Sequence, residues 1–139
     1  MIDIENYVYT QVRTAIKGAF PLADVSGTYI STPSTFPHVS IEETDSYSLA
    51  DRISTSDREY AANLTYTVNI YTNTATAKSD AKAIAAVVND AFTDFGFARS
   101  MKQEMPNIDR TIYRLILRFQ ATAWKSADGA ADHFNITAR

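Results

Sequence analysis

The chain has 139 residues, a formal net charge of −3 and no cysteine. This length suits one domain with a substantial core, and a hydrophobic fraction of 45% excludes wholesale disorder. The lack of cysteine excludes disulfide scaffolds, thiolate metal sites and thiol nucleophiles, and the negative charge argues against binding nucleic acid by its phosphates. No apolar run approaches the ~20 residues of a membrane span, and the acidic N-terminus has no apolar signal core. We therefore expect neither a membrane anchor nor secretion.

The first expected element is an amphipathic helix over residues 3–19, which ends near Gly18 and Pro21. Its apolar side chains recur at helical spacing along one stripe: Ile4, Val8, Val12, Ala15, Ile16 and Ala19. Residues 22–41 are irregular or extended. Within them, residues 31–37 contain two prolines and predict a loop, and residues 38–42 alternate as a half-buried strand does.

The middle of the chain changes from a polar segment to a clear strand. Residues 42–58 are polar and charged and predict a long loop or a mobile hairpin arm, and loops of this length are usually functional or disordered. Residues 59–73 alternate with period two. Their apolar face carries Tyr60, Ala62, Leu64, Tyr66, Val68 and Ile70. The opposite face is mostly polar, so we expect one face of the sheet against helices and the other against water or a partner.

A second helix is expected over residues 76–95, with Thr76 as its N-cap and Gly96 at C′. Its apolar stripe contains Ala77, Ala81, Ile84, Val88, Ala91, Phe92 and Phe95. Residues 97–105 look extended, residues 106–109 predict a turn and residues 110–124 alternate again, which together indicate a hairpin. Residues 125–139 lack a sustained period and predict a flexible C-terminal tail.

These elements predict an α+β fold in two layers, with a mainly antiparallel sheet of four to five strands and two helices packed on one face. We expect a single domain over residues 1–124 with a mobile arm at about 42–58, followed by the tail over 125–139. No internal repeat or domain boundary is evident.

No pattern of residues indicates a catalytic, cofactor or metal site. His38 and His133 lie far apart in the sequence and no acidic cluster has ligand spacing, which disfavours a metal site. The run from Ser79 to Lys82 matches the Ser-x-x-Lys pattern of acyl-transfer enzymes, but the chemistry of a helix start explains it better. Tyrosine-rich strands leave open a small-ligand pocket lined by Tyr60, Tyr66 and Tyr113, although such tyrosines are more often core or interface.

The charge distribution is more informative. Residues 42–59 contain six carboxylates against two arginines, a net charge of −4, and residues 97–125 contain six cations against two carboxylates, a net charge of +4. Ordinary surface charge is one explanation, and a solvated acidic loop suffices for residues 42–45. The sharper hypothesis is a head-to-tail contact in which the acidic arm of one subunit meets the basic hairpin of the next. The subunit-interface residues this predicts are Glu42, Glu43, Asp45, Arg52, Arg58, Arg114 and Arg118.

The order of the elements and the amino-acid sequence of residues 64–124 resemble a known family. The stretches that carry the resemblance are 64–73 (LTYTVNIYTN), 78–84 (KSDAKAI), 92–97 (FTDFGF), 105–109 (MPNID) and 111–115 (TIYRL). The chain resembles the tail terminator or tail-completion proteins of long-tailed bacteriophages, including their prophage-encoded minor capsid relatives. The resemblance covers most of residues 1–124.

The resemblance implies a structural virion protein that assembles in the host cytoplasm and acts at the head–tail junction. Its partners would be further copies of itself in a six-membered ring, the tail tube protein and the head connector or head-closure protein. DNA would pass through the lumen without sequence-specific binding, and no enzyme activity, cofactor or membrane contact is implied. Another neck or head-closure adaptor of the same virion remains an alternative, and a small-ligand-binding domain is a second one.

Overall fold

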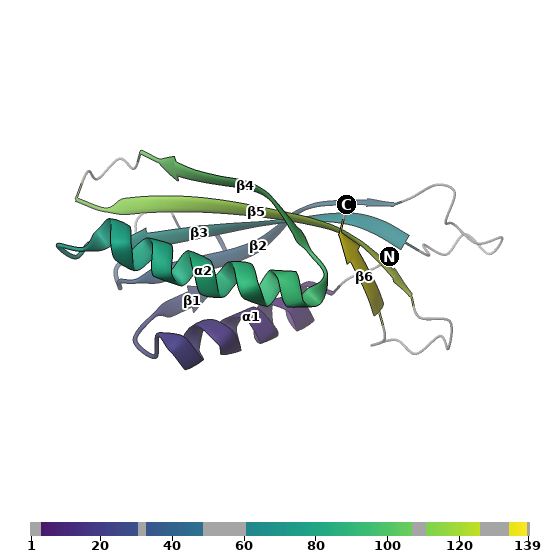
Figure 1. Ribbon diagram of the computed structural model, residues 1–139, viewed down its shortest axis with the longest axis horizontal. Coiled ribbons are helices and arrows are strands. Elements are labelled where there is room, and N and C mark those ends of the chain that lie inside the picture. The colour runs from purple at the N-terminus through teal and green to yellow at the C-terminus, as the bar shows by residue number, and fades with distance from the viewer. Residues whose placement is uncertain (1–3, 31–32, 49–60, 107–110, 126–133, 139) are drawn as a thin grey trace.

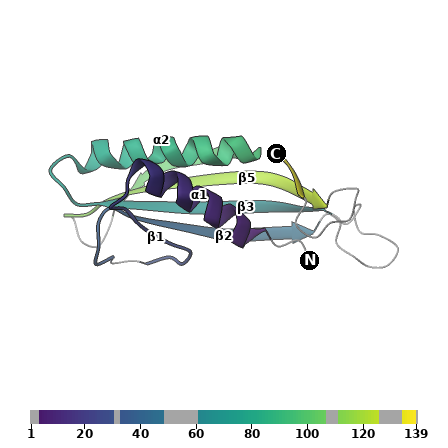
Figure 2. The ribbon, with the colours of Figure 1, turned by 90° about the horizontal axis from the view of Figure 1, so that it is seen from below.

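A computed structural model describes residues 4–30, 33–48, 61–106, 111–125 and 134–138. In chain order its elements are α1 (Glu5–Ala19), β1 (Asp24–Ser26), β2 (His38–Ser48), β3 (Ala61–Thr72), α2 (Ala77–Phe95), β4 (Ala98–Met105), β5 (Tyr113–Lys125) and β6 (Phe134–Ala138). The strands form one sheet in the order β1-β2-β3-β5-β4, and β6 pairs with β5 beyond β4. All of these pairings are antiparallel except that of β1 with β2. Both helices lie on one side of the sheet (Figures 1 and 2), which confirms the predicted two-layer α+β fold.

Strands β3 and β5 form the centre of the sheet. They pair without interruption from Ala61 opposite Trp124 to Thr72 opposite Tyr113. Because side chains alternate between the two faces of a strand, this register places one apolar set under the helices. These side chains are buried: Ala62, Leu64, Tyr66, Val68, Ile70, Leu115, Leu117, Phe119, Ala121 and Ala123. The predicted apolar face of β3 is therefore confirmed over the described residues.

The helices cover this apolar face with the stripes expected from their periodicity. Helix α1 buries Val8, Val12 and Ile16. Helix α2 buries Ala81, Ile84, Ala85, Val88 and Phe92. An aromatic cluster joins the two layers, since the rings of Phe92 and Phe119 stack with centroids 4.3 Å apart and Phe97 meets Phe92 edge-on at 5.3 Å. Such pairs add about 0.5–1.5 kcal/mol beyond the burial of their area.

Helix α2 ends at Gly96, as predicted. Gly96 has a left-handed backbone with φ of 101°, and its N–H donates to the Thr93 carbonyl at 2.9 Å. The next N–H, that of Phe97, donates to the Phe92 carbonyl at 3.0 Å, so the chain turns back and returns the Phe97 ring to the core. Thr76 occupies the predicted N-cap position, but its hydroxyl bonds the Asp80 carboxylate at 3.1 Å and makes no cap to the backbone.

The segment expected to be a long loop begins as a strand. Strand β2 continues through Glu42 and Glu43 to Ser48, paired with β3, so residues 42–48 match the hairpin alternative and not the loop. A β-bulge between Glu43 and Asp45 interrupts the ladder there, and the Thr44 hydroxyl lies 3.0 Å from that of Thr67. Residues 49–58 lie outside the described residues. The polar side chains of residues 42–48 did not prevent strand formation, because the backbone of β3 supplies hydrogen-bond partners for the backbone of β2.

Two short strands also differ from expectation. Residues 134–138, expected within a flexible tail, form β6 and pair with the last residues of β5. Residues 24–26, within the segment expected to be irregular or extended, form a strand that was not predicted individually, β1, beside the start of β2. The Tyr9 hydroxyl of α1 donates to the Val25 carbonyl at 3.1 Å and holds β1 in place. Strands this short carry no periodicity, so only pairing with a distant strand reveals them.

Replacing Gly96 and Gly18 with alanine should change the stability of the protein in opposite directions. Gly96→Ala places a side chain in the left-handed region and should destabilise the protein by about 1–2 kcal/mol. Gly18→Ala lies in α1 with nothing within 4 Å of the added Cβ and should stabilise it by about 0.5–1 kcal/mol. Chemical denaturation of both variants measures the difference. Equal effects of the two substitutions would contradict this account of the helix ends.

Candidate subunit interface

The face of the sheet opposite the helices, called the back face here, carries four of the seven residues predicted at a subunit interface. The register places side chains from three strands in rows across it. From one end to the other these rows are His38–Tyr71–Arg114, Ser40–Asn69–Ile116, Glu42–Thr67–Arg118 and Asp45–Thr65–Gln120. The structure therefore brings Glu42, Asp45, Arg114 and Arg118 to one face. Arg52 and Arg58 lie outside the described residues.

Glu43 does not belong to this face. It lies opposite Tyr66 in the register, on the helix side of the sheet, and its carboxylate accepts a hydrogen bond from the Tyr66 hydroxyl at 3.3 Å. Its own N–H donates to the Glu5 carboxylate of α1 at 2.9 Å. Glu43 thus connects α1, β2 and β3 within one subunit. Successive side chains of a strand point to opposite faces of the sheet, so Glu42 and Glu43 cannot share a surface. Because the sequence predicts a loop or mobile arm at this position, it groups the two residues together.

Arg114 is engaged within its own subunit. Its Nε and Nη2 donate to the Asn69 side-chain oxygen at 3.1 and 2.9 Å. Its guanidinium carbon also lies 5.2 Å from the Tyr29 ring centroid and 5.7 Å from that of Tyr71. Such contacts stabilise a guanidinium and the rings around it. Arg114 therefore attaches the segment that contains Tyr29 to the sheet.

This segment follows β1 and covers part of the back face. Figure 2 shows it below the strands, on the side away from α2. Tyr71 beneath it is fully buried. Burial raises the pKa of the Tyr71 hydroxyl to about 12, the neighbouring Tyr29 hydroxyl adds to the increase, and the Arg114 guanidinium opposes it. Tyr29 lies in a region without sequence periodicity, so no signal in the sequence could have paired it with Arg114.

The other half of the back face has exposed side chains on its outer strands, although Thr65 at its centre is buried. Asp45, Arg118 and Tyr47 are exposed there, and Tyr47 retains 63% of its accessible surface. Glu42 is half-buried, and none of these charged side chains forms an ion pair with a described residue. Glu42 and Arg118 are separated by β3, which places their Cα atoms roughly 10 Å apart. Glu42, Asp45 and Tyr47, which we call the acidic edge, thus remain available to a partner.

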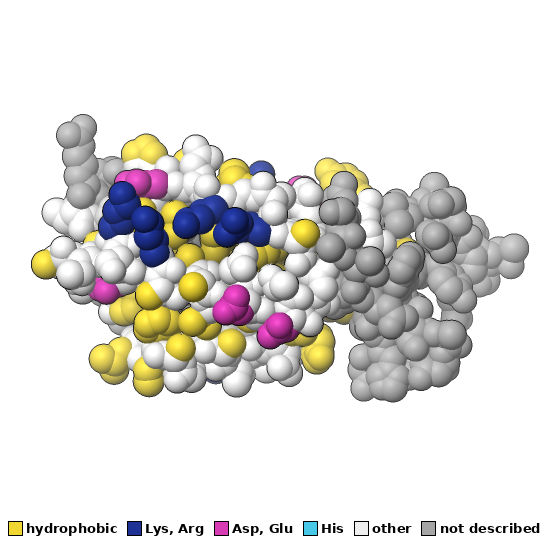
Figure 3. Space-filling view, in the orientation of Figure 1, with side chains coloured by type: hydrophobic (Ala, Val, Ile, Leu, Met, Phe, Trp, Pro, Cys, Tyr) yellow, Lys and Arg dark blue, Asp and Glu magenta, His cyan; other side chains and the backbone are white. Residues whose placement is uncertain are grey.

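A basic surface lies on the helix side of the opposite sheet edge. Arg99 and Lys102 of β4 pair with Phe119 and Leu117, whose side chains face the helices. Lys78 and Lys82 lie on the flank of α2 away from α1, because Ala91, Asp94 and Phe95 occupy the flank toward α1. Lys78, Lys82, Arg99 and Lys102 form the basic stripe. Figure 3 shows lysine and arginine side chains gathered in one group over α2 and β4.

The basic stripe was missed by reasoning from the sequence. The four cations are all exposed, and none has an ion pair with a described residue. Lys78 and Lys82 recur at helical spacing, which places them on one flank of α2. Which flank faces β4 depends on the packing of α2 against α1. The sequence also combined Arg99 and Lys102 with Arg114 and Arg118, although the sheet separates these two pairs onto opposite faces.

Of the residues that the sequence raised as candidates for a metal or catalytic site, His38 is buried, and Ser79 and Lys82 are exposed. The Nδ1 atom of His38 lies 3.0 Å from the Asp24 carboxylate; His133 lies outside the described residues. Ser79 and Lys82 both lie on the first turns of α2. Within the described ranges, no three histidine, aspartate or glutamate side chains gather as metal ligands.

No helix in the part of the chain that the structure describes is long and apolar enough to cross a membrane.

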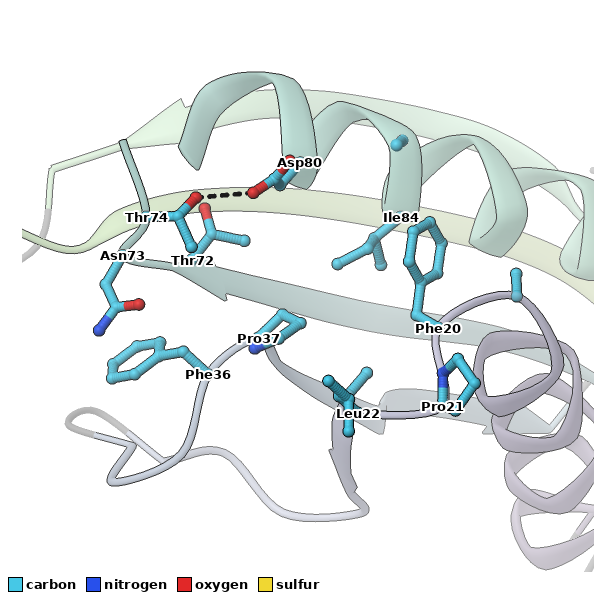
Figure 4. Close-up of a pocket in the computed structure, with 13 residues that line it drawn as sticks. Phe20, Pro21, Leu22, Phe36, Pro37, Thr72, Asn73, Thr74, Asp80 and Ile84 are labelled. Atoms are coloured by element: carbon cyan, nitrogen blue, oxygen red, sulfur yellow. Dashed lines mark hydrogen bonds between the residues drawn. The ribbon is translucent and has the colours of Figure 1, made fainter. Parts of the chain in front are cut away.

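An apolar pocket of about 300 Å³ lies where the end of α1, the start of β2 and the start of α2 meet (Figure 4). Phe20, Pro37 and Ile84 contribute to its walls. Its carboxylate, that of Asp80, accepts hydrogen bonds from Thr74 at 2.6 Å and Thr76 at 3.1 Å. A ligand site needs polar groups directed at the ligand, whereas the Asp80 carboxylate is already hydrogen-bonded to Thr74 and Thr76.

The tyrosine pocket considered from the sequence does not form from the described residues. The Tyr66 side chain is fully buried in the aromatic cluster, with Phe97 5.3 Å from it edge-on. Tyr113 is half-buried against the core, where burial and then the Glu104 carboxylate raise the pKa of its hydroxyl. Tyr60 lies outside the described residues. Tyr66 is therefore a core residue, and Tyr113 packs against the core.

The comparisons with known proteins bear on the fold. No protein-family model and no curated protein matches the chain. Among solved structures, a chain from the virion of native gene transfer agent (GTA) particle matches with a TM-score of 0.60 and 21% identity, over 84% of this chain and 91% of that one. The gp17 protein of bacteriophage SPP1 matches with a TM-score of 0.41 and 16% identity, over 83% and 88% of the two chains. The first match shows a shared fold.

The two arginines of the back face should behave differently. Arg114→Lys loses the paired bonds to Asn69 and should destabilise the protein by about 1–3 kcal/mol. Arg118→Lys, in the same strand and on the same face, should change stability by less than about 0.5 kcal/mol. Denaturant unfolding measures both values. Equal losses would contradict the assignment of Arg114 to the fold and Arg118 to the open surface.

Alkaline pH should test the burial of Tyr71. A folded-state pKa of about 12 against an ordinary value of 10.0 means that folding favours the neutral hydroxyl. Its contribution to stability is complete below pH 10 and is lost as the pH rises to 12. The wild type should therefore lose stability more steeply across this range than Tyr71→Phe, followed by circular dichroism.

Proposed function

We propose that this protein is a structural component of a phage-like virion, in which copies of the chain form a ring that terminates the tail tube and joins it to the head connector. The ring would be six-membered and would sit at the head–tail junction. DNA would pass through its lumen without sequence-specific binding. The role is one of shape and subunit contact and involves no reacting centre.

The fold carries this proposal. The fold of the chain matches that of a chain in the virion of a gene transfer agent particle, over 84% of this chain and 91% of that one. A match over nearly all of both chains favours a shared architecture over a shared fragment. Because one fold can serve many functions, the fold alone does not select this role, and the sequence resemblance of residues 64–124 to tail terminator proteins supports the finer assignment.

The surface of the molecule supports assembly. The acidic edge and the basic stripe each expose charges that have no ion pair with described residues. Asymmetric surfaces of opposite charge on one subunit favour a heterologous contact, and such a contact produces a ring when its rotation closes. This arrangement supports a ring-forming protein over a small-ligand enzyme.

Particles made without this protein should show a defect that distinguishes a tail terminator from other virion components. Without a terminator, tail tubes should grow beyond their normal length and fail to join filled heads. Electron microscopy of particles made without the gene measures tail length and attachment. Supplying the gene from a plasmid should restore normal virions, which controls for effects on neighbouring genes.

The alternative neck adaptor gives a different result. An adaptor would leave tails of normal length, unattached to heads, and would copurify with the portal and not with the tail tube protein. Native mass spectrometry of the purified protein should show a hexamer, alone or after addition of tail tubes. A protein that stays monomeric under both conditions would overturn the ring.

A further inference from the structure

We propose that the acidic edge of one copy docks against the basic stripe of the next copy, so that the edge of one sheet overlaps the edge of the next. This inference rests on the proposed ring and names the surfaces that build it. The acidic edge lies on the back face of β2, and the basic stripe lies on the helix side of β4 and α2. The back of one edge therefore covers the front of the other.

The topology places the two surfaces at opposite ends of the sheet. In the strand order, β4 is one edge, and β2 beyond Ser40 is the other edge among the described strands, because β1 pairs with it only from His38 to Ser40. One subunit thus offers both halves of the contact without using either on itself. A chain of such contacts runs head to tail, as a ring requires.

The charges select this arrangement over a twofold dimer. A twofold axis through the basic stripe would bring Lys78, Lys82, Arg99 and Lys102 of two copies together. These cations outnumber the neighbouring Glu104 carboxylate of β4, so the contact would be repulsive on balance. The head-to-tail arrangement instead places Glu42 and Asp45 against these cations. Tyr47, exposed on the same face of β2, adds an aromatic side chain of the kind enriched in interfaces.

The docking surface differs from the residues that the sequence suggested. Arg114 is occupied by Asn69 and two tyrosine rings, and Glu43 is hydrogen-bonded within its own subunit. Arg118 lies on β5, one strand in from the edge and on the back face, whereas the stripe is on the front. The basic partner of the acidic edge is therefore formed by α2 and β4.

Charge reversal tests the pairing directly. Glu42→Lys with Asp45→Lys reverses the acidic edge, and Lys78→Glu, Lys82→Glu, Arg99→Glu and Lys102→Glu together reverse the basic stripe. Each of these two variants alone should assemble at least about tenfold more weakly than the wild type, because like charges now meet. A mixture of the two should assemble again into rings in which the variants alternate, because both junctions are then complementary. Native mass spectrometry, with tail tubes present if the wild type needs them, reads the composition.

Matched controls separate this docking from folding and from the ring itself. Arg13→Glu with Lys17→Glu reverses two cations on α1 and should assemble as the wild type does. The neutral pairs Glu42→Gln with Asp45→Asn and Lys82→Gln with Lys102→Gln should weaken assembly less than the reversals and make it less sensitive to salt. Circular dichroism confirms that each variant is folded.

Three results would overturn the proposal. Reversed variants that each form rings as well as the wild type would exclude this docking while leaving the ring intact. A stripe variant that forms rings but no longer attaches to tail tubes would assign the stripe to a different protein. A wild type that never assembles would remove the proposed ring itself, and the docking with it.

Discussion

The unbroken pairing of β3 with β5 is the constraint on which the rest of the structure depends. Twelve consecutive residue pairs hold one register, from Ala61 with Trp124 to Thr72 with Tyr113. A shift by one residue would turn every side chain of a strand to the other face, exposing the apolar set and burying Arg118. The helices, the aromatic cluster and the rows of the back face are all positioned by this register. The flanking strands β2 and β4 lie on either side of this central pair, whose two faces already differ.

The same alternation divides charges that lie close together in the sequence. Arg114 and Arg118 share a face, yet Arg114 is used to attach the segment containing Tyr29, and Arg118 is left open. Arg99 and Lys102 belong to the neighbouring strand and point to the helix side, where they join two lysines of α2. Net charge over a segment therefore describes composition, whereas the strand register decides which charges act together.

The proposed assembly uses the edges and leaves the core unchanged. Edge strands expose unpaired backbone groups, and β2 carries features that limit unwanted pairing: the bulge at Glu43, the Glu5 carboxylate on the Glu43 N–H, and the acidic side chains. β4 likewise carries a bulge and exposed cations. Such features favour contact through side chains of opposite charge over extension of the sheet by backbone hydrogen bonds. This accords with overlapping edges in a ring.

Several elements followed from the sequence alone because their signals are local. The helical stripes around Val12 and Val88, the period-two run through Tyr66, and the left-handed turn at Gly96 each depend on a few neighbouring residues. These patterns determined two helices, the long central strand and the hairpin, and hence the two-layer fold. The same reasoning placed Glu42 and Asp45 at a candidate interface, and the register later put both on one face.

Contacts between distant segments decided the rest. Strand β1 exists because β2 is beside it, and β6 because β5 continues past β4. Tyr29 meets Arg114, and Lys82 lies on the same side of the sheet as Lys102, only after the helices and strands have packed. The sequence by itself determined which residues prefer the interior and at what period they recur. Which charged side chains share a surface was decided by tertiary structure, because side-chain direction depends on strand register and helix packing, and neither is a local property of the chain.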